Sequence, residues 1–311
     1  MTSLRGREVA VALLIDALYG EPPEILHPTV WMGRAISIFE GVALESKNPG
    51  SRYLFGIALA LSLPALVFIA VRRLLDLTPR HPRWALEAAL ISTALSMRGL
   101  AAAAAAVERE LRAGDLEGAR AGAARLVGRD TAGLPAPEVA RAAIESVAEN
   151  TSDGVVAPML YGLLFGGPGA LAYRAVNTMD SMVGYRIHPY AELGCASARL
   201  DDVANLAPAR LTALLVAAVS GRPLHTIRIA RRYGPLTSSP NAGWAEAAFA
   251  GALDSRLGGS NSYGGVIREG PVLGEGAPPG AEEIRRSVSL MRRCCVLFVA
   301  AAVLVGRGLR G

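Results

Sequence analysis

Long apolar runs alternate with short polar motifs along this chain. Residues 53–71 carry no charged side chain and are followed by Arg72 and Arg73. That run is close to the roughly 20 residues that an α-helix needs to cross the hydrocarbon core of a bilayer. A second candidate, residues 84–107, is weakened by Glu87 and Arg98. Further apolar segments are residues 155–176, 211–219 and 294–305. The pattern predicts an all-α, polytopic integral membrane protein, with a soluble all-α protein as the alternative.

The apolar segment 155–176 is interrupted by G-G-P-G at 166–169. Gly and Pro both disfavour a continuous helix there. Each half is about ten residues long, too short to span a bilayer. We therefore predict a re-entrant helical hairpin, which returns the chain to the side it left and brings together the polar motifs that flank it.

A charged, Ala-rich stretch predicts an extramembrane helical insert at 107–147, with a helical hairpin over 108–129 punctuated by Gly114-Asp115. Segments rich in Gly, Pro and Ser at 235–240 and 258–280 read as loops. We expect one membrane-embedded domain over 1–311, with the main active-site region at 149–265.

The composition excludes several function classes. Half of the residues are hydrophobic, and the net charge of +5 comes from Arg scattered among acidic residues, which argues against nucleic-acid binding. Lys47 is the only lysine, so a Walker A loop is excluded and a Schiff-base enzyme is disfavoured. The three cysteines support neither a disulfide framework nor a zinc site. The basic residues of 72–83 place that loop in the cytoplasm.

Three short motifs place carboxylates and amides among these apolar segments. They read E-N-T-S-D-G at 149–154, N-T-M-D-S-M-V-G at 177–184 and R-L-D-D-V-A-N at 199–205. Glu149 and Asp153 are four residues apart and would share a face of an α-helix. Carboxylates in such surroundings are costly without a charged partner. Because Mg²⁺ prefers oxygen ligands, the three motifs together predict a metal–phosphate site. One alone would be read as a cap or an exposed face.

Other residues are weaker candidates for ligand binding. Arg174, Arg186, Arg199 and Arg210 alternate with the acidic motifs. Each could bind phosphate bidentately, or pair with a nearby Asp or extend to the membrane interface. Ser239 and Asn241 precede an Ala-rich helix whose first N–H groups suit an anion. His27 is a lone histidine, for which a structural role is the more usual one.

In this order, the motifs resemble those of the CbiB/CobD family, the adenosylcobinamide-phosphate synthases, which are membrane proteins of cobalamin biosynthesis. The matching strings are D-A-L-Y-G-E-P-P at 16–23, H-P-T-V-W-M-G-R at 27–34, A-E-N-T-S-D-G-V-V-A-P at 148–158, A-V-N-T-M-D-S-M-V-G-Y-R at 175–186, A-R-L-D-D-V-A-N-L-A-P-A-R-L at 198–211, S-P-N-A-G-W-A-E-A-A at 239–248 and L-G-G at 257–259. Glu21 departs from the family, which usually has Asp there, but the carboxylate is kept.

The resemblance implies a ligase that uses ATP as co-substrate and Mg²⁺. Such enzymes join a propionate carboxylate of adenosylcobyric acid to the amine of aminopropanol phosphate, or of aminopropanol. On this resemblance, metal and ATP are expected at Glu149, Asp153, Asp180, Asp201 and Asp202, all but Asp201 also being catalytic candidates. The expected substrate- and phosphate-binding residues are Asn150, Asn177, Asn205, Asn241, Arg186, Arg199, Arg210, Ser239 and His27. Loops from Ser239 and Leu257 are expected to cover the corrinoid.

Other functions stay open from the sequence. A polyprenyl transferase also uses Asp-rich motifs in membrane helices, but the spacing here matches its motifs poorly. An AmpE-like membrane sensor, or a transporter using its carboxylates as an ion pathway, would lack ligase activity. The resemblance places the protein in the cell membrane, and we expect the active site to face the cytoplasm. Its expected partners are the lipid bilayer, a membrane enzyme of a later cobalamin step and further copies of itself.

Overall fold

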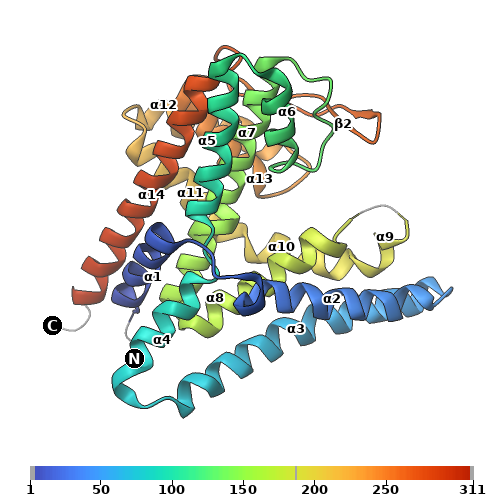
Figure 1. Cartoon of the computed structure of the whole chain (residues 1–311), viewed down its shortest axis with the longest axis vertical. Coiled ribbons are helices and arrows are strands. Elements are labelled where there is room, and N and C mark those ends of the chain that lie inside the picture. Colours follow the sequence, from blue (N-terminus) through green and yellow to red (C-terminus); the bar gives the residue numbers. More distant parts are fainter. Residues whose placement is uncertain (1–3, 186–187, 309–311) are drawn as a thin grey trace. The chain divides into compact units, whose positions relative to one another are not determined.

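The computed structural model of the chain describes residues 4–185 and 188–308. Helices dominate it, and its strands are only two or three residues long (Figure 1). In the described part of the chain, four helical stretches are long and apolar enough to cross a membrane: Pro49–Leu77, Arg80–Ala113, Ala136–Val183 and Ala281–Gly306. A fifth is added if the bent pair Cys195–Ala204 and Leu206–Val219 counts as one span. The prediction of an all-α polytopic membrane protein is confirmed.

Contacts divide the chain into two compact units, and each is described by itself. Unit 1 comprises Met1–Ser96, Ala157–Asn205 and Val299–Gly311, and unit 2 comprises Met97–Val156 and Leu206–Phe298. Both units are discontinuous in sequence, so each is assembled from segments far apart in the chain. The expectation of a single membrane-embedded domain stays a prediction.

Unit 1 is built from helices that pack around α3 and α8. Its elements are α1 (Gly6–Tyr19), the 3-10 turn η1 (Glu24–Leu26), α2 (Pro28–Glu45), α3 (Pro49–Leu77), α4 (Arg80–Ser92), α8 (Ala157–Val183), α9 (Tyr190–Leu193) and α10 (Cys195–Ala204). Side chains before a proline cap two of these helices: Asn48 Oδ1 accepts the Gly50 N–H at 2.9 Å, and His27 Nδ1 accepts the Thr29 N–H at 3.3 Å. These caps fix where α2 and α3 begin.

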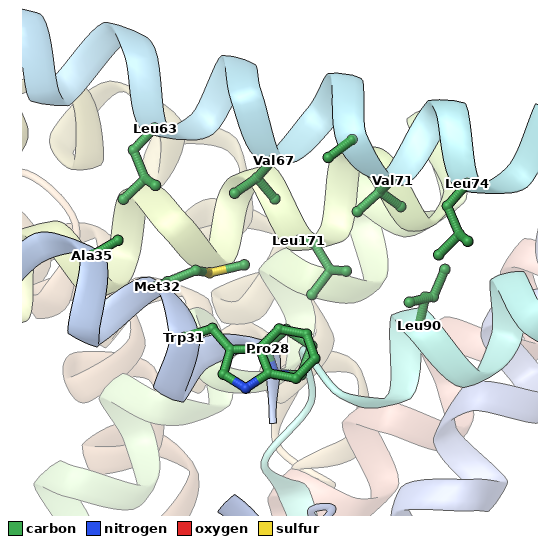
Figure 2. Close-up of a pocket in the computed structure, with 11 residues that line it drawn as sticks. Pro28, Trp31, Met32, Ala35, Leu63, Val67, Val71, Leu74, Leu90 and Leu171 are labelled. Carbon is green, nitrogen blue, oxygen red and sulfur yellow. The ribbon is translucent and has the colours of Figure 1, made fainter. Parts of the chain in front are cut away.

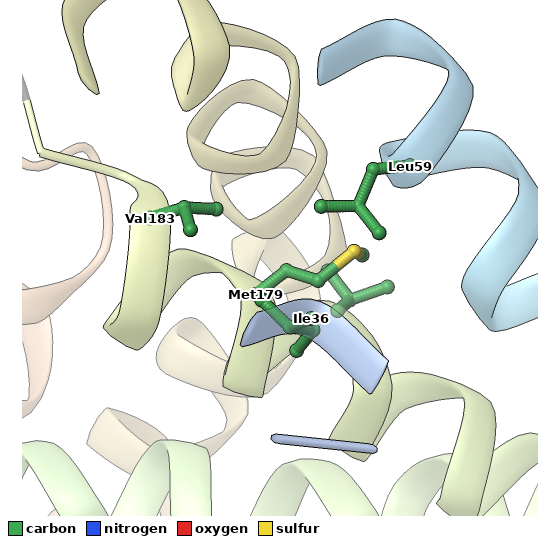
Figure 3. Close-up of a cluster of buried hydrophobic side chains, with 5 residues drawn as sticks. Ile36, Leu59, Met179 and Val183 are labelled. Carbon is green, nitrogen blue, oxygen red and sulfur yellow. The ribbon is translucent and has the colours of Figure 1, made fainter. Parts of the chain in front are cut away.

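The membrane-length helix α3 buries only a narrow face. Gly56, Leu59, Ala60 and Leu75 are buried, whereas large apolar side chains such as Leu66 remain exposed. Water would not tolerate so wide an apolar surface, but a lipid environment does. On the inward side, α2, α3 and α8 share a core made of Ile36, Leu59, Val176, Met179 and Val183 (Figure 3).

An apolar cavity of about 370 Å³ separates α3 from α2, α4 and α8. Figure 2 shows Leu63 and Val67 of α3 facing Trp31 and Leu171 across it. The Trp31 indole N–H donates to the Ile25 carbonyl at 3.0 Å, and it is the one side-chain donor among the lining residues. This cavity therefore offers nothing that would hold a phosphate or a carboxylate.

The predicted break in the apolar segment lies at Gly166. Its φ of 76° and ψ of −162° interrupt α8. The rings of Tyr161 and Tyr173, on either side of the break, stack with centroids 5.1 Å apart. In a straight helix these two residues would lie about 18 Å apart along the axis. The chain therefore doubles back at this point, as the hairpin prediction requires.

Two charged side chains stabilise the ends of the broken helix. Glu87 of α4 accepts the Gly167 N–H at 3.3 Å, and Arg5 donates to the Leu164 carbonyl at 3.4 Å. Arg5 and Glu87 also form an ion pair at 2.8 Å. A carboxylate thus meets the positive end of one half-helix and a guanidinium meets the negative end of the other.

Unit 2 contains α5 (Met97–Ala113), α6 (Leu116–Ala124), α7 (Ala136–Thr151), the π-helical turn η2 (Ser152–Val156), α11 (Leu206–Val219), α12 (Pro223–Tyr233), the 3-10 turn η3 (Gly234–Leu236) and α13 (Ala242–Leu253). The long helix α14 (Ala281–Gly308) begins in unit 2 and ends in unit 1. The structure has a helical hairpin here: α5 and α6 meet at Gly114, and Asp115 caps α6 by accepting the Gly118 N–H at 2.9 Å. Its first helix begins at Met97 rather than at residue 108, and its location outside the membrane stays a prediction.

The Gly-rich segment after α13 is more ordered than its composition predicts. β1 (Leu257–Gly258) pairs with β4 (Val272–Leu273), and β2 (Asn261–Tyr263) pairs with β3 (Val266–Arg268). Asp130 accepts hydrogen bonds from the Ser262 hydroxyl at 2.6 Å and from the N–H groups of Gly264 and Gly265. These bonds hold the pKa of the Asp130 carboxyl below its usual value. The ionised carboxylate therefore anchors the β2–β3 hairpin.

Candidate active site

Two of the three acidic motifs meet within unit 1. Asn205, at the C-terminal end of α10, donates to Asp201 Oδ2 at 3.0 Å, and the Tyr173 hydroxyl of α8 donates to Asn205 Oδ1 at 2.7 Å. Asn177, also on α8, lies within hydrogen-bonding reach of Asp201. The structure thus links the N-T-M-D and R-L-D-D-V-A-N motifs through one polar cluster, which comprises Tyr173, Asn177, Asp201 and Asn205.

Asp201 is the carboxylate of this cluster, and it is buried. It is only 9% exposed, and its Oδ1 atom has no hydrogen-bond partner in the described part of the chain. Buried polar atoms are nearly always paired, so an idle carboxylate oxygen calls for a ligand or for a functional explanation. Asp180 and Asp202 are half-buried nearby in sequence, on α8 and α10 respectively.

Arg174 borders the polar cluster and acts electrostatically on His27. Arg174 donates to Asn177 Oδ1 at 3.3 Å, and its Nε is buried without a partner among the described residues. His27 caps α2, with its Nε2 atom 3.7 Å from Glu21 Oε2. Burial lowers the pKa of His27, with Glu21 opposing and Arg174 adding to the shift. A neutral imidazole suits the capping role, and the assignment of His27 to substrate binding stays a prediction.

The first acidic motif, E-N-T-S-D-G, belongs to unit 2. Glu149 and Asn150 end α7, but Asp153 lies in the π-helical turn η2. The wider turn changes the angular spacing, so the α-helical spacing assumed for Glu149 and Asp153 does not apply. Such turns are frequent at functional sites. Asn150 donates to the Ser146 carbonyl at 3.0 Å. The gathering of all three motifs by the hairpin stays a prediction.

Three more predicted residues meet in unit 2. Arg210 donates to Asn241 Oδ1 at 2.7 Å, and its guanidinium lies over the Trp244 ring at 4.9 Å. The Ser239 hydroxyl accepts the N–H groups of Asn241 and Ala242 at 3.2 and 3.3 Å. Ser239 therefore caps α13, which leaves fewer N–H groups for an anion than the sequence predicts.

Two predicted arginines join neither group. Arg186 lies outside the described residues. Arg199 is exposed on α10 and makes no ion pair or hydrogen bond with the described part of the chain. The loop from Leu257 forms the two short β-ladders, and whether it covers a corrinoid stays a prediction.

Unit 2 also contains a polar cavity of about 240 Å³. Its walls come from α7, α13, β1, β2 and the loop after α6, and its lining residues are Leu126, Val127, Gly128, Arg129, Glu145, Ser146, Glu149, Glu246, Gly258, Asn261 and Tyr263. Of these, only Glu149 was predicted as a site residue. The apolar cavity of Figure 2 has no such lining, so this one is the better candidate for charged ligands.

Glu246 of α13 has a strongly perturbed carboxyl. Burial raises its pKa well above the usual value, and the neighbouring carboxylates Glu145 and Glu149 raise it further. The guanidinium groups of Arg129 and Arg141 oppose this shift. Like charges gathered in a cavity favour a cation between them, and perturbed carboxyls of this kind cluster at functional sites.

The residues can be tested for their fit to Mg²⁺. Within residues 4–185 and 188–308, no three His, Cys, Asp or Glu side chains form a ready-made metal site. Mg²⁺ does not require one, because it is usually bound through one or two carboxylates, with substrate phosphates and water supplying the other ligands. Glu149 and Glu246 line one cavity, and Asp201 keeps an idle oxygen. Both settings fit Mg²⁺ that arrives with a phosphate.

Sequence reasoning missed Arg129, Glu145, Glu246 and Asn261 as site residues. Arg129 and Glu145 stood in the segment assigned to an extramembrane insert, where charge is ordinarily solvated. Both are buried instead, with side-chain exposures of 5% and 11%. Glu246 gave a detectable signal, because it is the only acidic residue of an otherwise apolar, Ala-rich helix.

Comparison with known proteins agrees with the motif pattern. The model of one protein family, described as CobD/Cbib protein, matches residues 9–291. The chain belongs to this family. Among its relatives are proteins named cobalamin biosynthesis protein CobD from Synechocystis sp. (43% identical, covering 86% of this chain and 81% of the relative) and from Sinorhizobium fredii (41%, covering 96% of both chains). The cobalamin biosynthesis protein CbiB of Salmonella typhimurium is 38% identical, covering 97% of both chains. No solved structure matches the chain.

Proposed function

We propose that this CobD/Cbib family member is an amide ligase of cobalamin biosynthesis that depends on ATP and Mg²⁺. It would join adenosylcobyric acid to aminopropanol phosphate, or to aminopropanol. Family membership and relatives named cobalamin biosynthesis proteins support the role in that process. The observation that carries the enzymatic proposal is the polar cluster of unit 1, in which Asp201 is held by Asn205 while its Oδ1 atom is idle.

The reaction requires activation of a poor electrophile. An oxygen of the substrate carboxylate attacks the γ-phosphorus of ATP, ADP leaves, and an acyl phosphate forms. The amine nitrogen then attacks the acyl carbon, the bond to the phosphate oxygen breaks, and inorganic phosphate leaves. The amine must lose a proton, so a carboxylate base is needed. Mg²⁺, when bound, would neutralise charge on the phosphates.

The protein's contribution in this scheme is positioning and proton transfer. Asn205 and Tyr173 fix the Asp201 carboxylate in one orientation, so that its idle oxygen can accept a proton or face a cation. Asp180 and Asp153, each half-buried, are candidates for the same work. Arg210, held by Asn241 and stacked on Trp244, is a cation placed to meet phosphate.

Basic residues at the end of α3 and at the start of α4 support a cytoplasmic active site in a multi-pass cell-membrane protein. Arg72 and Arg83 both bind Asp76, at 3.1 and 2.9 Å, while Arg73 and Arg80 add further positive charge there. ATP and the corrinoid substrate would then come from the cytoplasm. A membrane enzyme of a later step and a second copy of the chain are the proposed protein partners.

Asp153→Asn and Asp180→Asn are each expected to lower ATP-dependent ligation by about 10²–10⁴-fold, because each removes a charge proposed to act on metal, phosphate or the amine proton. The measurement is product formation by purified full-length protein in detergent, with thermal unfolding as the check on folding. Asp254→Asn is the matched control. Asp254 is exposed, pairs with Arg222, and has a left-handed backbone that Asn tolerates. Unchanged ligation in both variants would refute the assignment.

The alternative function is a membrane sensor or transporter without ligase activity. Such a protein would bind no Mg²⁺–ATP and would tolerate neutralisation of the acidic motifs if it were a sensor. Binding of a non-hydrolysable ATP analogue in the presence of Mg²⁺ would favour the ligase over both alternatives.

A further inference from the structure

Arg129 is a buried arginine, and two of its three nitrogens have no hydrogen-bond partner in the described part of the chain. Its Nη1 donates to Glu145 Oε2 at 2.7 Å and also to Asn261 Oδ1. The two nitrogens without a partner are Nε and Nη2, and both atoms are buried. A buried donor left unpaired costs free energy, so its persistence in a native site needs an explanation.

The two unused nitrogens lie on the same edge of the guanidinium. That edge presents parallel N–H groups in the geometry that binds two oxygens of one phosphate or carboxylate. Arg129 lines the polar cavity of unit 2, so a ligand bound there would lie beside the residue that carries this unused edge. The Glu145 ion pair holds the other side of the group in place.

The carboxylates that line this cavity differ in their contacts. Both oxygens of Glu145 are occupied, because Oε1 accepts the Gly258 N–H at 2.7 Å and Arg141 Nη1 at 3.0 Å while Oε2 accepts Arg129. Glu145 is therefore an anchor. Glu246 makes no ion pair or hydrogen bond with the described residues, and Glu149 lines the cavity beside it.

A phosphate alone would not enter a cavity that contains these two carboxylates, since like charges repel. A divalent cation between the carboxylates and the phosphate would offset this repulsion. Mg²⁺ commonly combines one or two carboxylates with phosphate oxygens. An arginine fork on one side and a carboxylate pair on the other are therefore complementary to a metal-bound phosphate.

We propose that this cavity binds the phosphate group of a substrate, with the Nε–Nη2 edge of Arg129 holding two phosphate oxygens and Glu149 and Glu246 facing the accompanying Mg²⁺. The inference rests on the proposed function and deepens it. The phosphate can come from ATP or from aminopropanol phosphate, and the experiment separates these sources.

The test is calorimetric binding to purified full-length protein in detergent. The probes are the ATP analogue AMP-PNP with Mg²⁺, and aminopropanol phosphate with and without Mg²⁺. Arg129→Lys keeps a positive charge beside Glu145 but loses the two parallel N–H groups of the guanidinium edge. It is expected to weaken binding of the probe that uses this cavity by about 10–100-fold. A loss confined to AMP-PNP identifies ATP as the source, and a loss confined to aminopropanol phosphate identifies the amine substrate.

Arg141→Lys is the matched control. Arg141 has the same 5% side-chain exposure as Arg129 and the same Glu145 partner. Its donors are already bound to Glu138, Glu145, Ser260 and Asn261. The substitution should lower thermal stability as much as Arg129→Lys does, while the folded fraction binds both probes within about threefold of wild type, as expected when no ligand-facing bond is lost. Equal loss of binding in both variants would show that Arg129 acts only through the fold.

Glu246→Gln provides a second test of the cavity, which can be used if Arg129→Lys does not fold. It removes a crowded carboxylate, and we expect it to fold and to raise the Mg²⁺ concentration needed for half-maximal binding by about tenfold or more. Wild-type protein that binds neither probe would contradict the proposed function itself. Wild-type binding that neither Arg129→Lys nor Glu246→Gln changes would overturn this inference alone.

Discussion

Gly166→Ala is expected to destabilise the protein by about 2–6 kcal/mol, which combines backbone strain with a steric overlap. The φ of 76° is one that alanine rarely adopts. A Cβ atom there would overlap Glu87 Oε1 and approach Arg5 Nε to 2.7 Å. Those two side chains hold the ends of the broken helix. The substitution would therefore strain the backbone at the turn and also displace the side chains that stabilise it. The measurement is the thermal unfolding midpoint of detergent-purified protein, together with the folded yield.

Gly167→Ala provides the matched control one residue away. A Cβ atom at Gly167 would find Leu90 Cβ at 3.4 Å and Glu87 Cγ at 3.7 Å, which are ordinary contacts. Alanine is favoured over glycine in a helix, but the ring of the following Pro168 disfavours a helical residue that carries a Cβ atom, so the two effects oppose each other. We expect this variant to unfold close to the wild-type midpoint. If both variants behaved alike, the reversal of the chain at Gly166 would be wrong.

Asp201→Asn is expected to lower ligation by about 10²–10⁴-fold while leaving the unfolding midpoint unchanged or raised. Asparagine can still accept the Asn205 hydrogen bond, so the cluster keeps its shape. The substitution removes a buried charge whose Oδ1 has no partner, and such a charge is costly to fold. A residue kept for structure would show the opposite result, with lower stability and intact activity.

Asp76→Asn tests whether any carboxylate-to-amide change has these effects. Asp76 is partly exposed and fully engaged, with Arg72 at 3.1 Å and Arg83 at 2.9 Å. We expect ligation close to wild type and a small change in stability, since exposed ion pairs contribute little. Intact ligation in Asp201→Asn would remove this residue from the proposed chemistry.

The features that depend on local composition could be predicted from the sequence. The uncharged run at 53–71 predicted the membrane-length helix α3, and G-G-P-G predicted the break that the structure places at Gly166. Gly114-Asp115 predicted the turn between α5 and α6. In each case Gly, Pro or an absence of charge acts on the backbone directly, so no knowledge of distant contacts is needed.

The features that depend on distant contacts could not be predicted. Arg129 and Glu145 are buried because the β1–β2 segment packs over them, and Gly258 and Asn261 bond to them from more than a hundred residues away. The π-helical turn at Ser152–Val156 could not be predicted either, because no residue type in it is specific to that conformation. The motif spacing of Glu149 and Asp153 was read on an α-helix for this reason.

The polar cluster of unit 1 could be predicted from the sequence only in part. The sequence predicted Asn177, Asp201 and Asn205 as members of one site, and the structure joins them through the Asn205–Asp201 hydrogen bond and the proximity of Asn177 to Asp201. It did not predict Tyr173, whose hydroxyl completes the cluster. A tyrosine in an apolar helix gives no sign of its partner until the hairpin brings α8 against α10.

The most direct test of the ligase account is the mass of the corrinoid product. Purified protein in detergent would receive adenosylcobyric acid, aminopropanol phosphate, ATP and Mg²⁺, with aminopropanol in a parallel reaction. We expect a corrinoid product heavier than adenosylcobyric acid by the condensed amine, formed only when both ATP and Mg²⁺ are present. Folded protein that leaves adenosylcobyric acid unchanged with either amine would contradict the account and favour a sensor or a transporter.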